Sequence, residues 1–478
     1  MNKPSSGSGD SIDGSAKTNN NSGNNSKKRN RGKWNGKNSF ENYKDASTTR
    51  LHPENVCSGD ECPCCHKGKM YESEDRKLLQ FTGNRPVEVS RYLKTVYRCN
   101  NCGYMVANNK NIEKWTNSSR SSIILQRIYG MPFYRLSQIQ TLSGVPISCS
   151  TLWEQYLYTW NEGGAREIFG WLLGTLAECK DFKIDDTSAK ILSVIKDNKL
   201  LKEQGKKKGR SCYSTTICSK TASGEVIILY LTGNKHAGEN IGNILKIRQD
   251  QTSSITIMRD ASSNNNPVLR EEEYKWLLNL ITIINCLAHG QRKFVELEQF
   301  YPEECGYFLE QTGGIYHNEH QCNNMNLSLE DKLKYHQEHS AKYISNVYNK
   351  IDQLFNEKKV EPNSKLGQAI RYWINNKAGL TQFLKVPLES LDNNWAERSL
   401  KTLILQRKNS LFFKTIDSAV VHSGMTSIVK TCSENSINAF KYLNWLQDNC
   451  TKAKKDPIRY TPFAYTKYMN DTELIKAA

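Results

Sequence analysis

The spacing of hydrophobic and polar residues changes several times along the chain, and each change predicts a different kind of element. From about residue 112 to 176, apolar side chains recur every three or four positions, which predicts helices. Within this region the runs 134–142 and 150–160 are separated by a break at 143–146, so that helix, turn and helix follow one another. This outline is typical of helix-turn-helix DNA-binding regions, although many helical hairpins without that role share it.

From residue 181 the pattern changes to short strand-like runs. We predict strands at 182–185 leading into 190–195, at 213–218 and at 225–231, joined by short connections as in an antiparallel meander. A helix at 239–248, a strand at 254–260, a helix near 271–280 and a buried strand at 281–286 follow. This is the element order of an RNase H-like sheet. The chain then reads as helical to about residue 383, which predicts a helical insertion.

Charge favours a polyanionic partner. The formal net charge is +17, and Lys and Arg side chains gain affinity for nucleic acid by releasing phosphate counterions, although a basic chain can also be merely soluble. No apolar run reaches the ~18–20 residues that span a bilayer, and the first residues lack an apolar signal-peptide core. Fifteen cysteines without an export signal predict reduced thiols, a metal site and a cytoplasmic protein.

Two Cys-x-x-Cys pairs suit a structural zinc ion, since four thiolates at tetrahedral positions close its coordination shell. We predict Cys62, Cys65, Cys99 and Cys102 as the ligands, and Cys64 is an alternative to Cys62. The stretch between the pairs exceeds the ~15–20 residues of compact zinc ribbons, and an inserted hairpin accounts for the difference.

Three acids from distant parts of the chain are candidates for one metal site. Asp185 and Asp260 follow strand-like runs, and Glu397 lies in a helical segment. Each acid alone reads most simply as a surface or capping residue. In an RNase H-like order, however, the first and fourth strands are neighbours, so their acids meet at one edge and can hold two Mg²⁺ (or Mn²⁺) ions ~3.5–4 Å apart. Asp186 competes with Asp185, and strand alternation puts the two on opposite faces.

Other polar residues near these acids have several interpretations. Cys286 and His289 form a Cys-x-x-His pair that can ligate zinc, but without a second pair at matching spacing a core or hydrogen-bonding role at the junction is favoured. We expect Asp392 to cap the helix that carries Glu397, and not to be the third metal ligand. Basic side chains near Glu397 either contact DNA phosphates or are ordinary exposed helix charges; they are Arg398, Arg407 and Lys408.

The predicted fold class is multidomain α+β, because 478 residues exceed one ordinary domain. It comprises a zinc ribbon-like module, a helical helix-turn-helix-like region and an RNase H-like α/β core interrupted by an all-α insertion. Residues 1 to about 50 consist mainly of Ser, Gly, Asn and Lys and have almost no aliphatic side chains, which predicts disorder. The predicted segments are a basic tail at 1–56, the zinc module at 57–110, the helical region at 111–178, the core at 179–290 and 386–450, the insertion at 291–385 and a C-terminal tail at 451–478.

With these residues in place, the chain resembles the large transposase protein of the insertion-sequence-66 family over roughly residues 60 to 450. The most specific likeness is the pattern Asp-Asn-Asn-x-Ala-Glu-Arg at 392–398, followed by Arg-Lys-Asn at 407–409. The family's Asp-Glu-Thr is matched at 185–187, its Cys-Trp-Ala-His at 286–289 and its Arg-Lys-Phe at 292–294. Three departures remove no expected metal ligand: Asp186 in place of Glu, the loss of the family's aromatic after Asp260, and Leu287 in place of Trp.

The resemblance implies a DDE transposase that cuts DNA at element ends and joins the 3′ ends to a target, with Asp185, Asp260 and Glu397 as the catalytic triad. It also implies DNA contacts for Arg135, Arg292 and Lys293, a homo-oligomer on DNA, a nucleoid-associated location in bacteria and small accessory proteins from neighbouring genes. The residues by themselves require only a nucleic-acid phosphoryl transferase. A metal-dependent nuclease without joining activity, and a domesticated zinc-containing DNA-binding protein with a relic core, are the alternatives.

Overall fold

The computed structural model describes residues 57–71, 86–93, 96–98, 105–107, 112–206, 209 and 211–477. The predicted tail at 1–56 lies outside these residues, as do two predicted zinc ligands, Cys99 and Cys102. The chain divides into two compact units, Met1–Asn84 and Arg85–Ala478, and each is described by itself. Among the described helices, none combines the length and hydrophobicity that a membrane crossing needs.

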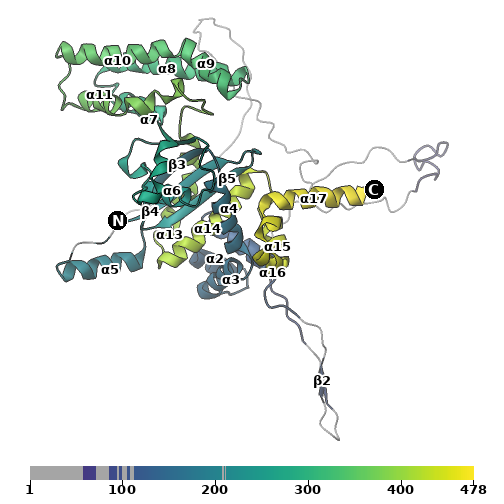
Figure 1. Cartoon of the computed structure of the whole chain (residues 1–478). Coiled ribbons are helices and arrows are strands. Elements are labelled where there is room, and N and C mark those ends of the chain that lie inside the picture. The colour runs from purple at the N-terminus through teal and green to yellow at the C-terminus, as the bar shows by residue number, and fades with distance from the viewer. Residues whose placement is uncertain are drawn as a thin grey trace, which may run out of the picture. The chain divides into compact units, whose positions relative to one another are not determined.

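A five-stranded mixed sheet is the centre of the second unit (Figure 1). Its strands lie in the order β5-β4-β3-β6-β7, with antiparallel pairing among the first three and parallel pairing from β3 through β6 to β7. The predicted order of three antiparallel strands followed by alternating helix and strand is therefore confirmed. The strands are β3 (Asp181–Ala189), β4 (Cys212–Lys220), β5 (Val226–Gly233), β6 (Ile255–Arg259) and β7 (Ile281–Asn285).

One predicted strand is wrong. Residues 190–195 do not continue the first strand, because β3 itself extends to Ala189 and the chain then forms helix α5 (Leu192–Glu203). The sequence of α5 contains three Leu and three Lys, whose side chains are not branched at Cβ and lose little freedom in a helix. None of its residues is buried and only Val194 packs on a hydrophobic cluster, so helix propensity contributes more than packing to its conformation. The helix expected near 271–280 is the 3₁₀ helix η3 (Glu272–Asn279).

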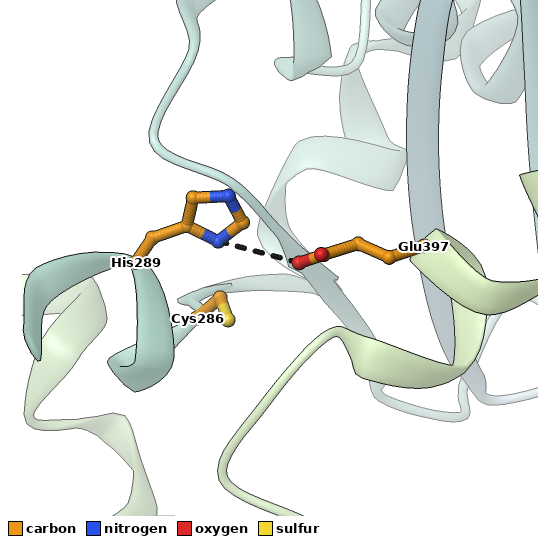
Figure 2. A group of neighbouring side chains, drawn as sticks. All are labelled: Cys286, His289 and Glu397. Atoms are coloured by element: carbon orange, nitrogen blue, oxygen red, sulfur yellow. Dashed lines mark ion pairs between the residues drawn. The ribbon is translucent and has the colours of Figure 1, made fainter. Parts of the chain in front are cut away.

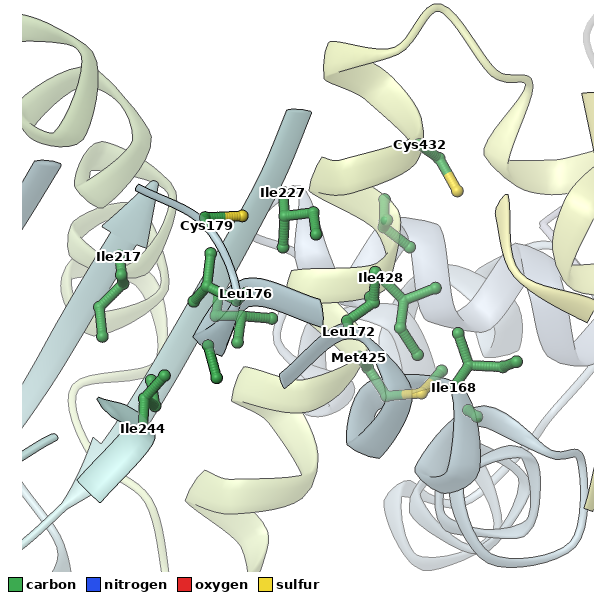
Figure 3. Close-up of a cluster of buried hydrophobic side chains, with 14 of the residues drawn as sticks. Ile168, Leu172, Leu176, Cys179, Ile217, Ile227, Ile244, Met425, Ile428 and Cys432 are labelled. Atoms are coloured by element: carbon green, nitrogen blue, oxygen red, sulfur yellow. The ribbon is translucent and has the colours of Figure 1, made fainter. Parts of the chain in front are cut away.

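Helices cover both faces of the sheet, following the alternation of side chains along the strands. On one face, β4 and β5 present Ile217 and Ile227 to helices α4 (Ala165–Ala177), α6 (Ala237–Leu245) and α14 (Ile416–Glu434) (Figure 3). On the other face, Cys218, Ile228 and Tyr230 contact Ala396, Leu400 and Leu403 of α13 (Asn394–Ser410). The core is thus a three-layer arrangement.

Helix α14 also covers the free edge of the sheet. Side chains four residues apart along α14 reach strand residues two apart along β5: Asn435 and Thr431 accept the N–H groups of Val226 and Ile228, and Ser427 accepts that of Tyr230. Four helical residues rise ~6 Å and two strand residues ~6.6 Å, so the two spacings match. This contact pairs N–H groups that an edge strand would otherwise offer to another chain.

The predicted helix, turn and helix before the core are confirmed as elements. Helix α1 (Asn117–Ile128) precedes α2 (Phe133–Leu142) and α3 (Cys149–Asn161). The turn after α2 contains Gly144, whose φ of +79° few other residues adopt at low cost. A short hairpin of β1 (Val96–Arg98) and β2 (Met105–Ala107) lies earlier in the chain.

The predicted helical insertion between β7 and α13 has its own hydrophobic core. Phe294 and Phe308 stack with ring centroids 4.2 Å apart, and the indole of Trp373 donates to the carbonyl of Gly290 at 3.1 Å. Its elements are α7 (Leu287–Val295), α8 (Pro302–Asn324), α9 (Leu329–His339), α10 (Ala341–Asn356), α11 (Lys365–Asn375), α12 (Lys377–Leu380) and η4 (Gln382–Leu384).

The chain ends in helices that pack on the core. Trp445 of α15 (Ala439–Asp448) lies against the rings of Tyr442, Tyr460 and Tyr465. The remaining elements in this segment are α16 (Cys450–Lys455), η5 (Pro457–Tyr460) and α17 (Pro462–Ala477).

Candidate active site

Asp185 and Asp260 come from neighbouring parallel strands. The register of β3 and β6 pairs Asp181 with Thr256 and Lys183 with Met258, and the same register continued for two residues places Asp185 opposite Asp260. Adjacent strands are ~4.8 Å apart, so the two carboxyl groups start from backbone positions close enough to share a cation. Asp185 does not end its strand, as the sequence suggested: it lies mid-strand and pairs with Thr216 of β4.

The electrostatics of Asp185 show that three acids act on one another. Burial and then the charge of Asp260 raise the pKa of Asp185 to about 7, and the charge of Glu397 acts in the same direction. The backbone N–H of Asp186 donates to Asp185 Oδ1 at 2.9 Å and opposes this rise. Like charges raise a carboxyl pKa only over short distances, so the fold brings together the three acids that the sequence singled out.

Asp186 faces the opposite layer, as strand alternation predicted. Its Oδ2 accepts the backbone N–H of Ala237 at 3.1 Å, at the start of α6. A carboxylate at a helix N-terminus satisfies a free N–H and interacts favourably with the helix dipole. Asp186 therefore has a structural partner on the α6 side of the sheet, whereas Asp185 is on the side of α13.

The loop after β6 holds Asp260 in place. Asp260 Oδ1 accepts hydrogen bonds from the backbone N–H of Ser262, at 3.1 Å, and from the buried side-chain amide of Asn265. The guanidinium of Arg259 donates to the carbonyl oxygens of Asp260 and Ser262, at 2.7 and 3.0 Å. These bonds leave Oδ2 of Asp260 as the oxygen available to a ligand.

The start of α13 is tied directly to the strand that carries Asp185. The buried side chain of Asn393 donates to the carbonyl of Ile184 at 2.8 Å, one residue before Asp185. Lys183 adds hydrogen bonds to Ser390 and to the carbonyl of Asp392. The N-cap residue is Asn393 and not Asp392, but Asp392 accepts the N–H of Asn394, the first residue of the helix, at 3.0 Å, as expected. Glu397 follows in the first turn.

Glu397 has basic neighbours from the first helix of the insertion. Nδ1 of His289 lies 3.6 Å from Glu397 Oε1 (Figure 2). Nη2 of Arg292 lies 4.0 Å from Oε2. Glu397 Oε1 is buried and has no hydrogen-bond partner among the described residues. Cys286 is buried and its Sγ accepts the N–H of Asn393 at 3.2 Å, which agrees with the predicted hydrogen-bonding role.

The six predicted DNA-contact residues fall into different surroundings. Arg292 is beside Glu397, and Arg407 is bound to β3 through Thr187 and Ser188. Lys293 lies over the ring of Tyr372, at 5.6 Å. Arg398 and Lys408 are exposed on α13, and Arg135 is exposed on α2, away from the three acids in the fold.

The sequence reasoning did not single out Asn393 and Asn265 as supports of the acids. Their side-chain amides are uncharged, so neither charge nor hydrophobic spacing marks them in the sequence. Only the position of Asn393 inside the 392–398 motif could have pointed to its role.

In the first unit, Cys62 and Cys65 form a tight turn. The N–H of Cys62 donates to the carbonyl of Gly68 at 2.7 Å, and the N–H of His66 to that of Cys62 at 2.9 Å. The backbone N–H groups of Lys67 and Gly68, and then the thiol of Cys62, lower the pKa of Cys65. Backbone donors around a sulfur favour its thiolate, the form that binds metal. The turn therefore fits half of a zinc site, and the other half lies outside the described residues.

A mixed α/β core with three acids at one place on its sheet, in a chain of net charge +17, fits the class of nucleic-acid-processing proteins. Sequence comparison identifies the family. Residues 115–421 match the model of the "Transposase IS66 family", and the chain belongs to that family.

Three curated relatives come from Sinorhizobium fredii (strain NBRC 101917 / NGR234). The uncharacterised protein y4jD is 26% identical over 159 residues, which cover 33% of this chain and 30% of that protein. The uncharacterised protein y4qI is 24% identical over 36% of this chain and 31% of its own length. The uncharacterised protein y4hP is 25% identical over 37% of this chain and 33% of its own length. The matches thus span about a third of each relative.

Proposed function

We propose that this chain is a DDE transposase with an RNase H-like core, which cleaves DNA at the ends of its element and joins the 3′ ends to target DNA. The single observation that carries the proposal is the proximity of Asp260 and Glu397 to Asp185, which their effect on the pKa of Asp185 and the register of the neighbouring strands support. Membership of the IS66 transposase family and the order of the five strands support it.

The three acids fit a pair of hard divalent cations. Carboxylate oxygens are the ligands that Mg²⁺ and Mn²⁺ prefer. Glu397 Oε1 is buried without a hydrogen bond within the described chain, and Asp185 is disfavoured as an anion until positive charge is near. When bound, two such ions would activate the attacking oxygen and stabilise the leaving oxygen of the phosphodiester.

The chain's own residues supply position and charge. Asp185 is fixed on β3, the loop after β6 holds Asp260, and Asn393 ties the helix of Glu397 to β3, so the three carboxylates would be held before DNA arrives. Arg292 and the exposed Arg398 and Lys408 are placed to contact phosphates, and Arg135 of α2 would contact DNA further from the reaction.

The remaining parts of the proposal concern zinc, assembly and location. Cys62 and Cys65 would hold a structural zinc ion together with Cys99 and Cys102. We propose that the protein acts as a homo-oligomer on DNA, with small accessory proteins from neighbouring genes, in the bacterial cytoplasm at the nucleoid.

Substitution of the triad tests the proposal. Asp185→Asn, Asp260→Asn and Glu397→Gln should each lower Mg²⁺-dependent cleavage and joining by at least ~100-fold, because each removes charge from the reacting centre, while binding to the element ends persists. Asp352→Asn, at an exposed position of α10, is the matched control and should keep full activity.

The two alternatives give different results in the same assay. Cleaved ends without any strand-transfer product would identify a nuclease. DNA binding without turnover in either Mg²⁺ or Mn²⁺ would identify a relic core. Full activity in any one triad variant would overturn the assignment of the triad.

A further inference from the structure

A second set of potential metal ligands adjoins the three acids and differs from them in chemistry. Cys286 follows β7 at the N-cap position of α7, and His289 lies one turn later on the same helix. One ligand atom from each of these residues and one from Glu397 all lie within 4.8 Å of one another (Figure 2). The set therefore offers one sulfur, one nitrogen and one oxygen.

The geometry of the His289–Glu397 pair suits a tetrahedral ion. Zinc binds nitrogen and oxygen at ~2.0–2.2 Å, so two such ligands of one tetrahedral ion are ~3.3–3.6 Å apart. The separation of His289 Nδ1 and Glu397 Oε1 is 3.6 Å. Both atoms are buried, and neither has a hydrogen-bond partner in the described part of the chain. A shared cation would satisfy both of them.

The sulfur of Cys286 is also arranged as a ligand. It accepts the N–H of Asn393 at 3.2 Å. Burial raises the pKa of this thiol, and the backbone N–H groups of Asn393, His289 and Ala288 oppose that rise. Such donors support negative charge on sulfur and fix the direction of its lone pairs.

We propose that Cys286, His289 and Glu397 form a site for one thiophilic divalent cation of the Zn²⁺ class, with a fourth position open to water or substrate. Three protein ligands and an open position are the pattern of zinc sites that are not purely structural. The thiolate excludes Mg²⁺ from this position, since Mg²⁺ takes oxygen ligands.

A regulatory consequence follows from the shared ligand, and it rests on the proposed transposase function. Glu397 belongs to both sites, and its Oε1 already lies 3.6 Å from Nδ1 of His289, where a soft cation would bind it. Zn²⁺ would then withdraw Glu397 from Asp185 and Asp260 and inhibit Mg²⁺-dependent cleavage. The proposed site itself does not depend on that function.

Cobalt binding by the full chain tests the site. Co²⁺ replaces Zn²⁺ and gives an absorption band when a thiolate binds it. Cys62→Ser/Cys65→Ser serves as the background, so that the turn of the first unit does not contribute. This background should bind one Co²⁺ with a thiolate band, and Cys149→Ser, at an exposed position of α3, should leave the band unchanged.

Two further variants in that background remove ligands of the site. Cys286→Ser should abolish the thiolate band. His289→Gln should weaken Co²⁺ binding by more than ~100-fold, because the loss of mere outer-sphere partners already costs ~10–100-fold. His289 is partly exposed, so its variant keeps the test valid if the buried Cys286→Ser protein fails to fold.

The outcomes separate the site from its consequence. Unchanged Co²⁺ stoichiometry and affinity in His289→Gln would overturn the site. If the site binds Co²⁺ as expected but Zn²⁺ does not slow Mg²⁺-dependent cleavage, measured relative to each protein's own rate without Zn²⁺, the regulatory consequence is wrong and the site stands. Absence of any cleavage by the wild-type chain would count against the proposed function and not against the site.

Discussion

Asp185→Asn should stabilise the metal-free protein, because the folded chain disfavours the ionised form of this carboxyl group. Burial and the charge of Asp260 raise the pKa of Asp185 to about 7 from 3.8. The folded pKa thus lies above the unfolded one, so unfolding between about pH 4 and pH 7 releases a proton. The stability of the wild type falls as pH rises through this window and levels off above it. The variant has no such proton and should not share the loss.

The size of the gain follows from the pKa. One pKa unit corresponds to ~1.4 kcal/mol, so the rise of Asp185 from 3.8 to about 7 sets a ceiling of about 4 kcal/mol. The hydrogen bond from the Asp186 N–H opposes the rise and is already included in that pKa, so it adds no separate cost. We expect a gain below this ceiling, of about 1–3 kcal/mol above pH 7 and almost none below pH 4.

Urea unfolding of the full chain in a chelator, followed by tryptophan fluorescence at several pH values, measures this gain. Asp352→Asn, which removes an exposed carboxyl of α10, should show no pH-dependent difference from the wild type. Added Mg²⁺ should stabilise the wild type, by ~2.7 kcal/mol at one hundred times its Kd, and should affect Asp185→Asn far less. A gain of equal size at every pH would refute the reasoning, since titration would not be its cause.

Three further predictions concern supports of the site and the core. Asn393→Ala should lower cleavage more than DNA binding, because it removes the hydrogen bond to the carbonyl of Ile184 that holds α13. The unpaired buried carbonyl should lower the stability by ~1–3 kcal/mol. Cleavage and gel-shift assays on the same protein check this. Gly424→Ala should lower the melting temperature and cost ~1–3 kcal/mol of stability, because its Cβ would clash with the ring of Trp160. Gly170→Ala is the control: its Cβ meets no atom within 4 Å, so the melting temperature should not fall. Cys62→Ser should lose a stoichiometric zinc ion by metal analysis, and wild-type protein without zinc would contradict the zinc module.

The spacing of apolar residues predicted most of the core, because each core element buries one of its faces and its apolar residues lie on that face. The strand that contains Ile227 and Leu229 packs on α4, α6 and α14, so its apolar pattern could be read directly. Residues 190–195 misled the prediction because Ile191, Val194 and Ile195 are β-branched and typical of strands. Local helix preference prevails in α5 because none of its residues is buried and only its first turn, through Val194, packs on a hydrophobic cluster.

The candidate site could be predicted only as far as its acids. Parallel pairing of the first and fourth strands follows from element order, and it brings Asp185 and Asp260 together. The contact between His289 and Glu397 does not follow from any pattern, because it depends on the angle at which α7 leaves the sheet. Side-chain packing within the insertion sets that angle, and the sequence alone does not reveal it.

The helical insertion contributes to the site because it leaves and rejoins the core at one place. The N–H of Leu287, at its start, donates to the carbonyl of Leu391, at its end, at 3.1 Å. Cys286 likewise donates to the carbonyl of Arg259 and accepts from Asn393, so β6, β7 and the start of α13 meet around one residue. A module closed in this way can be long without displacing Glu397. Its first helix carries His289 and Arg292 to that carboxylate, so a change in how the insertion packs would act directly on the charge environment of the three acids.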